Sequence, residues 1–277
     1  MLKGQTIDSG NNSTNVQGKE VTFVQNNMGL SYSDVKDIAM NVFKSNFYDL
    51  GEKVEELVQE RAEKLLDDYL DKLKEKNPKY IKNTEDPDLR YVIYEAQKNY
   101  ARRNDINIEK LLVDTLVERT IYKGDSIKEL VLNEALSIIP KLTSKQIDIL
   151  SLIFFVKYVR GNLPTAFIVN IMDRIRGNIN IDERDNFYQH LQYTSCISIS
   201  IGQVDFYSTM IGKSAEMTDV SKTKEIVDNN SKLSSIRSMW DNSQLCHASL
   251  TSVGMAIAIV NINTKLGLGL DYDIWIK

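Results

Sequence analysis

The spacing of apolar residues after residue 30 constrains this chain most strongly. Apolar side chains recur at intervals of three and four through residues 35–73, the pattern of one face of an α-helix. Gly51 lies within this pattern, and an interior glycine costs roughly 1 kcal/mol relative to alanine, so it bends the helix or breaks it in two. A stripe of this length needs a partner, either later helices of the same chain or the same helix of a neighbouring subunit.

The start of this helix is equally well marked. Ser31 and Asp34 have the spacing of a capping box, and Leu30 and Val35 have the spacing of a hydrophobic staple. These interactions fix the direction in which the preceding residues leave the helix.

Residues 1–28 differ sharply in character, being rich in Asn, Ser, Thr, Gly and Gln with few charges. Residues 14–17 and 21–25 are β-prone, and the turn at Gly18 and Lys19 makes them a hairpin or a β-arch. An isolated pair of strands is not stable in water, so its open edges invite strands from other copies, and Asn or Gln ladders can stack them. The alternative from composition is a flexible tail.

We therefore expect a homo-oligomer. Its predicted interface combines the β-prone segment with the first turns of the helix: Val16, Gln17, Val21, Phe23, Val35, Val42 and Phe43. On this hypothesis Phe43→Asp dissociates the assembly and leaves a folded monomer, whereas Leu65→Asp unfolds the chain.

The predicted fold class is mainly α. A helical bundle carries a short N-terminal β oligomerisation segment and a small α+β C-terminal part. The expected divisions are a self-association segment (1–30), a long amphipathic helix (31–76), a helical core (77–180) and a C-terminal subdomain (181–277). The apolar run 149–156 predicts the most buried helix and is far shorter than the ~20 residues of a membrane span.

The predicted C-terminal subdomain contains both strand-like and helix-like sequence patterns. Residues 196–201 are predicted to form a half-buried strand, with residues 204–207 as its partner. Residues 217–230 are polar and are expected to be exposed, and Thr251 is expected to cap a helix. A last apolar segment, ending in Trp275, is strand-like. This order resembles a winged helix, and with few basic residues beyond Lys232 and Arg237 it fits protein contacts better than DNA. The alternative is that the region forms no winged helix at all.

Composition limits the classes of protein to which this chain can belong. The 277 residues are 42% hydrophobic and 26% charged with a net charge of −4, the balance of a soluble globular protein without global attraction to nucleic acid or anionic lipid. Two widely separated cysteines, Cys196 and Cys246, fit a reducing cytoplasm.

Candidate chemistry is sparse. His190, His247, Cys196 and Cys246 offer zinc-ligand types, but their spacing matches no usual structural zinc pattern. Acidic residues cluster at Asp182, Glu183 and Asp185, where they serve metal-dependent nuclease chemistry or simply a helix start.

Basic residues gather at Lys98, Arg102 and Arg103, which complement a helix C-terminus or bind nucleic acid. No phosphate loop, dinucleotide fingerprint or catalytic serine motif occurs. We assign no catalytic, cofactor-binding or metal-binding residue, and an enzyme is disfavoured.

Residues 10–17, 29–39 and 42–47 resemble an N-terminal module of uncharacterised bacterial proteins found near anti-phage systems, and residues 250–258 with Trp275 look like the C-terminus of small abortive-infection-type proteins. The resemblance implies a bacterial cytoplasmic protein of a defence system. The residues themselves predict self-association through the N-terminal segment, and another protein partner is a further expectation. The alternative is a nucleic-acid-binding or metal-dependent nuclease effector.

Overall fold

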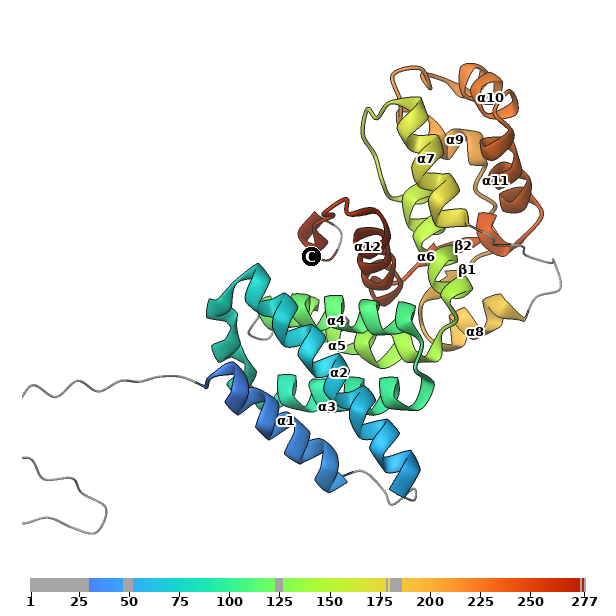
Figure 1. The fold of residues 1–277 in the computed structure, drawn as a ribbon. Helices are drawn as coiled ribbons and strands as arrows, with labels where there is room; N and C mark the ends of the chain where they lie inside the picture. Colours follow the sequence, from blue (N-terminus) through green and yellow to red (C-terminus); the bar gives the residue numbers. More distant parts are fainter. Residues whose placement is uncertain are drawn as a thin grey trace, which may run out of the picture.

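The computed structural model describes residues 30–46, 52–122, 127–177, 179, 186–274 and 276. Over these residues the chain is mainly α-helical, as predicted. Figure 1 shows a first group of helices, α1 to α5, below a second group that includes α7 and α9 to α11, with α6 and α12 between the groups. The first group consists of α1 (Tyr32–Asn46), α2 (Glu52–Lys76), η1 (Pro78–Glu85), α3 (Pro87–Arg103), α4 (Ile106–Ile121), α5 (Ile127–Ile138) and η2 (Ile139–Lys141). The elements that follow are α6 (Ser144–Lys157), α7 (Thr165–Arg176), α8 (Phe187–Tyr193), β1 (Ile197–Ile199), α9 (Phe206–Met210), α10 (Val220–Asp228), α11 (Ser231–Asp241), η3 (Gln244–Cys246), β2 (Ala248–Leu250), α12 (Ser252–Leu266) and η4 (Tyr272–Ile274).

The amphipathic stripe at residues 35–73 is divided between two helices, the second of the alternatives that Gly51 left open. Helices α1 and α2 lie side by side in opposite directions (Figure 1), and residues 47–51 between them lie outside the described residues. The stripe therefore finds its partners within the chain, because α1 packs on α2 and α3, and α2 packs on α3 and α4.

The predicted capping box starts α1. The Asp34 amide donates to Ser31 Oγ at 3.2 Å, and the Ser31 amide donates to Asp34 Oδ2 at 2.8 Å. Hydrogen bonds from Ser31 also hold the pKa of Asp34 below its usual value.

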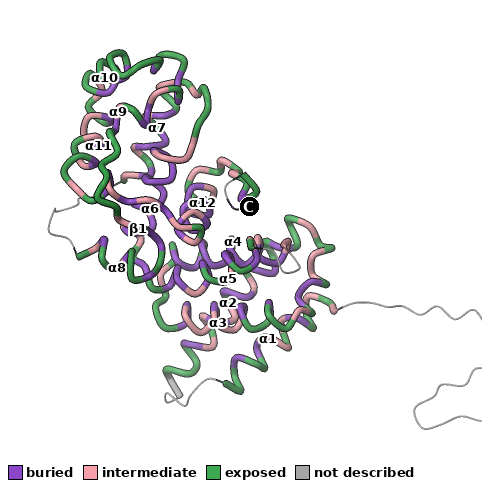
Figure 2. The backbone as a smooth tube through the Cα atoms, turned by 180° about the vertical axis from the view of Figure 1, so that it is seen from behind, coloured by how far each residue is buried: buried purple, intermediate pink, exposed green. Residues whose placement is uncertain are grey.

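Helices α6 and α12 form the centre of the core, and Figure 2 shows both largely buried. The run 149–156, predicted as the most buried helix, is fully buried in α6. Polar side chains still pair between the two helices, since Asn261 donates to Ser151 Oγ at 2.8 Å and to Asp148 Oδ1 at 2.9 Å. Helix α12 also packs on α4 and α5, so it joins the two groups of helices.

The sheet differs from the predicted hairpin. Strand β1 pairs with β2 in antiparallel register, with Ile197 opposite Leu250, and not with residues 204–207. In place of a strand, Asp205 caps α9 by accepting a hydrogen bond from the Ser208 amide at 2.7 Å. The cap at Asp205 thus starts a helix, and β1 pairs with the more distant β2 and not with the alternating residues 204–207.

Two other C-terminal expectations can be compared with the structure. The polar region 217–230 is mostly exposed, as predicted, although it contains α10 and buries Met217 and Val227. The strand-like end of the chain instead forms the short helix η4. Thr251 does cap α12, as predicted, by accepting from the Gly254 amide at 3.1 Å.

The described residues contain no hairpin wing of the kind a winged helix has, because three α-helices and η3 separate β1 from β2 in the chain. No helix in the described ranges has both the length and the apolar character needed to cross a membrane. The proposed divisions at residues 30, 76 and 180 stay predictions.

Candidate functional site

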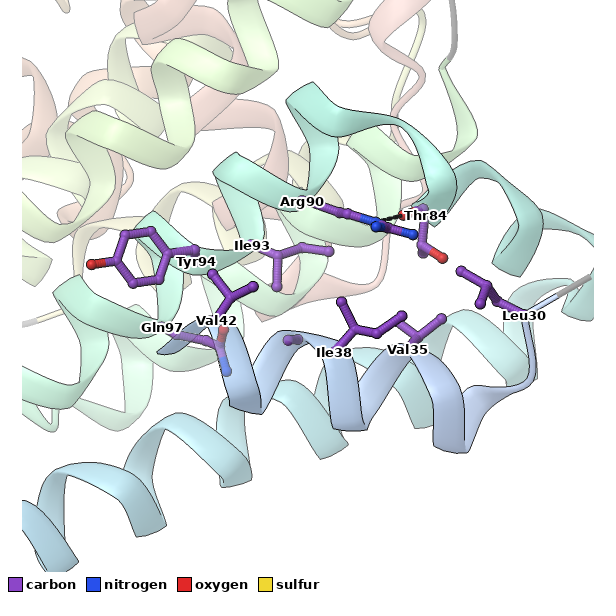
Figure 3. A pocket seen from close by; sticks show the side chains of 10 residues that line it. Leu30, Val35, Ile38, Val42, Thr84, Arg90, Ile93, Tyr94 and Gln97 are labelled. Atoms are coloured by element: carbon purple, nitrogen blue, oxygen red, sulfur yellow. Dashed lines mark hydrogen bonds between the residues drawn. The ribbon is translucent and has the colours of Figure 1, made fainter. Parts of the chain in front are cut away.

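An apolar groove follows the outer side of α1, where this helix lies against α3. Its lining residues are Leu30, Val35, Ile38, Ala39, Val42, Thr84, Arg90, Ile93, Tyr94 and Gln97. The groove is shallow, with a volume of about 30 Å³. Figure 3 shows the α1 side chains along one wall and those of α3 along the other, with Leu30 at one end and Tyr94 at the opposite end.

One buried polar group in the groove lacks a partner. Gln97 is fully buried, and its Nε2 donates to the Ala62 carbonyl at 3.2 Å, but its Oε1 accepts no hydrogen bond among the described residues. Leaving a buried acceptor unsatisfied costs about 1–3 kcal/mol, so such groups usually meet a ligand, a water or a partner. Because Oε1 itself is buried, it lies beneath the apolar surface and is not open to a molecule docked in the groove.

Arg90 supplies a hydrogen-bond donor at the edge of the groove. Its Nε donates to the Thr84 carbonyl at 2.9 Å, which anchors the side chain, while its terminal guanidinium nitrogens form no hydrogen bond or ion pair with the described residues. Figure 3 shows Arg90 and Thr84 together near the Leu30 end. The groove therefore combines apolar walls with one exposed cation near its Leu30 end.

Ion pairs hold α1 in the position that forms the groove. Lys36 Nζ lies 2.9 Å from Glu63 Oε1 and 2.8 Å from Asp67 Oδ1 on α2. Hydrogen bonds to Asp67 and Glu63 raise the pKa of Lys36 well above its usual value. All three side chains are partly exposed, so screening by solvent keeps their contribution modest.

The predicted interface residues fall into three classes. Val16, Gln17, Val21 and Phe23 lie outside the described residues. Val35 and Phe43 are only 5% and 1% exposed, because each packs against neighbouring helices of its own chain. Val42 is 39% exposed and lines the groove. Of the three helix positions, Val42 keeps the most surface for a contact with another subunit.

The four candidate zinc ligands have other roles. The Cys196 thiol is buried, and burial raises its pKa to about 11, so it stays protonated at neutral pH. His190 Nδ1 hydrogen-bonds to Gln146 Nε2 at 3.0 Å, and His247 Nδ1 lies 3.2 Å from the Gly202 carbonyl. No group of three or more His, Cys, Asp or Glu side chains with a metal-binding arrangement occurs in the described ranges.

The structure gives little support to a nucleic-acid-binding role for the candidate residues. Asp182, Glu183 and Asp185 lie outside the described residues. Arg103 donates to the carbonyls of Pro140 and Leu142 and so joins α3 to η2, while Lys98 pairs with Glu95 at 3.0 Å. Arg102 is exposed. Two of the three basic side chains thus make intramolecular contacts.

A larger polar cleft of about 570 Å³ lies between the C-terminal end of α2, α4 and the end of α12. Lys72 and Lys76 line it, but they form ion pairs with Asp114 and Glu118 across the cleft. Their charges are neutralised within the protein, so the cleft has no concentrated charge with which to hold an anion. We therefore consider the α1–α3 groove the stronger candidate.

Sequence reasoning could identify the apolar face of α1 but not the groove itself. Gln97 and Arg90 lie on α3, some 50 positions further along the chain, and only tertiary packing brings them beside Val42 and Leu30. An unpaired buried amide leaves no signal in a single sequence.

A protein-family model matches residues 29–216 and 205–276. The chain belongs to this uncharacterised family. The match covers most of the chain and includes every residue of the groove, whereas residues 1–28 precede it. The family brings no assigned activity. Comparison with curated proteins gives no significant match, and neither does comparison with solved structures.

Proposed function

We propose that this protein is a non-enzymatic, self-associating protein in which residues 1–28 link copies and α1 connects that link to the helical core. The observation that carries the proposal is the α1–α3 groove, an apolar surface that begins at Leu30, directly after the N-terminal segment. Apolar surface of this kind is stabilised when another polypeptide covers it.

The setting we propose is the bacterial cytoplasm, in antiviral defence. Cys196 and Cys246 are both free thiols, which agrees with a reducing compartment. The resemblance of residues 29–39 and 42–47 to modules near anti-phage systems supports the defence role. The alternative, a nucleic-acid-binding or nuclease effector, has less support because Arg103 and Lys98 make contacts within the chain.

Size-exclusion chromatography with light scattering tests the proposal. We expect the full chain to be an oligomer at micromolar concentration and a chain lacking residues 1–28 to be a monomer. The deletion leaves Ser31 and Asp34 in place, so α1 keeps its cap and circular dichroism should show unchanged helicity. A monomeric full chain, or an oligomer that survives the deletion, would contradict the proposal.

A further inference from the structure

We propose that β1 pairs with β1 of a second copy of this chain, antiparallel about a two-fold axis at Ser198, so that the two small sheets form one four-stranded sheet. The inference rests on the proposed function, in which residues 1–28 hold the copies together. It adds a second contact between copies, in the C-terminal part of the chain, that fixes how the linked copies are placed.

Two backbone hydrogen bonds show which way the groups of β1 point. The Ser200 amide donates to the His247 carbonyl at 3.2 Å, and the Thr251 amide donates to the Cys196 carbonyl at 3.1 Å. Successive residues of an antiparallel strand turn their N–H and C=O groups to opposite edges. The even-numbered positions of this segment therefore face β2, and the odd-numbered positions face away from it.

The outward edge of β1 is open among the described residues. It consists of the N–H and C=O groups of Ile197 and Ile199, and none of these four groups forms a hydrogen bond with another described residue. The outward edge of β2 differs, because the Leu250 amide donates to Tyr158 Oη at 3.0 Å at the end of α6. Figure 1 shows the two strands beside α6. The sheet can therefore be extended on the side of β1.

The sequence around β1 carries none of the usual protection of an open edge. Edge strands of monomeric proteins commonly have charges or prolines that keep other strands away. Residues 191–204 contain no Asp, Glu, Lys, Arg or Pro. Near a two-fold axis, any charge would lie close to the same charge of the second copy, and like charges across strands repel. The absence of charge therefore suits an identical edge as the partner.

The register follows from the outward groups. When Ser198 lies opposite Ser198 of the second copy, Ile197 of each copy lies opposite Ile199 of the other. Such a pair exchanges two hydrogen bonds, so all four outward groups of each β1 gain a partner. A shift by two residues would place one of these isoleucines opposite a residue outside β1. The register centred on Ser198 is thus the one that satisfies the whole edge.

Two exposed apolar side chains flank β1. Tyr193 is 86% exposed and Ile201 is fully exposed, which makes them the most exposed large apolar side chains in the described ranges. In an antiparallel pair, the chain that leaves one β1 runs beside the chain that enters the other. Ile201 of each copy therefore approaches Tyr193 of the other, and both lose apolar contact with water.

The contact is too small to hold two copies by itself. A three-residue edge and its flanking side chains cover less than the roughly 1,000 Å² of a stable interface. Copies that are already linked through residues 1–28 meet at an effective concentration of about millimolar, at which a weak contact forms. The pairing of β1 therefore agrees with a monomer after deletion of residues 1–28.

Disulfide cross-linking in the full chain tests the register. In the proposed pair, the two Ser198 residues are not hydrogen-bonded to each other and have Cα atoms about 4.5 Å apart, which suits a disulfide. Ser198→Cys changes an exposed side chain. Ser200→Cys is the matched control, because it is also exposed but lies about 13 Å along the strands from its counterpart. The natural Cys196 and Cys246 are buried.

Under a mild oxidant, Ser198→Cys should form a disulfide-linked dimer roughly tenfold faster, or more, than Ser200→Cys or the unmodified chain, as read by non-reducing electrophoresis. Adding Ile201→Asp to Ser198→Cys should slow this reaction roughly tenfold, because two like charges then lie near the axis. Leu130→Asp in the same background is the control, since Leu130 is 62% exposed on α5, and it should leave the rate unchanged.

Light scattering on the reduced samples separates this inference from the proposed function. If the full chain is an oligomer but Ser198→Cys cross-links no faster than Ser200→Cys, the pairing of β1 is overturned and association through residues 1–28 stands. An unchanged rate with Ile201→Asp would overturn the antiparallel arrangement. If the full chain is a monomer and Ser198→Cys does not cross-link selectively, the proposed function and this inference both fail.

Discussion

Gly254 on α12 lies so close to the Cys196 carbonyl that a β-carbon at this glycine would be 2.0 Å from the carbonyl oxygen. The same carbonyl accepts hydrogen bonds from the Thr251 amide at 3.1 Å and from Thr251 Oγ1 at 3.2 Å. The start of α12 is thereby fixed against the residue that precedes β1, and glycine is the residue that permits this approach.

Gly254→Ala should therefore destabilise the protein. Backbone cannot move aside as a flexible side chain can, so the methyl group must displace α12 or break the hydrogen bonds from Thr251. We expect a loss of roughly 1–3 kcal/mol in the free energy of unfolding, measured by urea denaturation. Gly202→Ala is the control, because its new β-carbon would approach nothing closer than Ser200 Oγ at 4.0 Å, and it should leave stability unchanged.

Phe43→Asp should destabilise the monomer itself, contrary to the expectation from sequence. Phe43 is 1% exposed, packs in a cluster with Val58 and Ala62, and meets the Tyr94 ring edge-to-face at a centroid distance of 6.5 Å. A carboxylate there would lose solvent without gaining a partner, and the expected loss is at least about 3 kcal/mol.

Thermal unfolding followed by circular dichroism checks this prediction against Leu65→Asp and Val42→Asp. Leu65 is fully buried, so its replacement should be as damaging as that of Phe43, whereas the exposed Val42 should tolerate the charge in the monomer. A folded, fully stable Phe43→Asp monomer would restore the original assignment of Phe43 to an intersubunit contact.

The features that can be predicted from this sequence are those determined by residues close together in the chain. The caps at Ser31 and Thr251 and the buried run in α6 could be predicted because each depends on residues within one or two helical turns. The pairing of β1 with β2 could not, since it joins residues about 50 positions apart and competes with a nearer alternating segment. The side of α1 that faces α3 is likewise set by tertiary packing, so the sequence alone does not show that Phe43 packs against Val58 and Ala62 of its own chain.

Lys213 should make stability depend on pH. Its Nζ is buried at the end of α6, where it donates to the carbonyls of Phe155, at 2.8 Å, and Val159. Burial, and to a lesser degree the charge of Arg160, lowers the pKa of Lys213 from 10.5 to about 7.

Because the folded pKa lies below the unfolded one, the unfolded state binds more protons between about pH 7 and pH 10.5, and stability rises with pH across this window. Lys213→Met lacks this titration. The free energy of unfolding of the unmodified chain, minus that of the variant, should rise by on the order of 2–3 kcal/mol between pH 7 and pH 9. Parallel pH profiles from urea denaturation would show that Lys213 titrates normally.

Arg119 should be among the most sensitive polar positions. Its guanidinium is 1% exposed and joins three helices, with Nη2 2.7 Å from Asp88 Oδ2 on α3 and in an ion pair with Glu129 on α5. Its Nε donates to Asn133 Oδ1 at 2.6 Å, and the hydrogen bond from Arg119 lowers the pKa of Asp88. The planar fork of donors, and not the charge by itself, fits this arrangement.

Arg119→Met should cost about 3–5 kcal/mol, because it removes the cation that the carboxylates of Asp88 and Glu129 share. Arg119→Lys keeps the charge but loses the fork, so it should cost less. The double variant Arg119→Met, Asp88→Asn removes one of the carboxylates left without this cation, and it should be more stable than Arg119→Met alone. Urea denaturation of the three variants decides the matter, since a double variant no more stable than Arg119→Met would mean that lost packing, and not unpaired charge, dominates the effect.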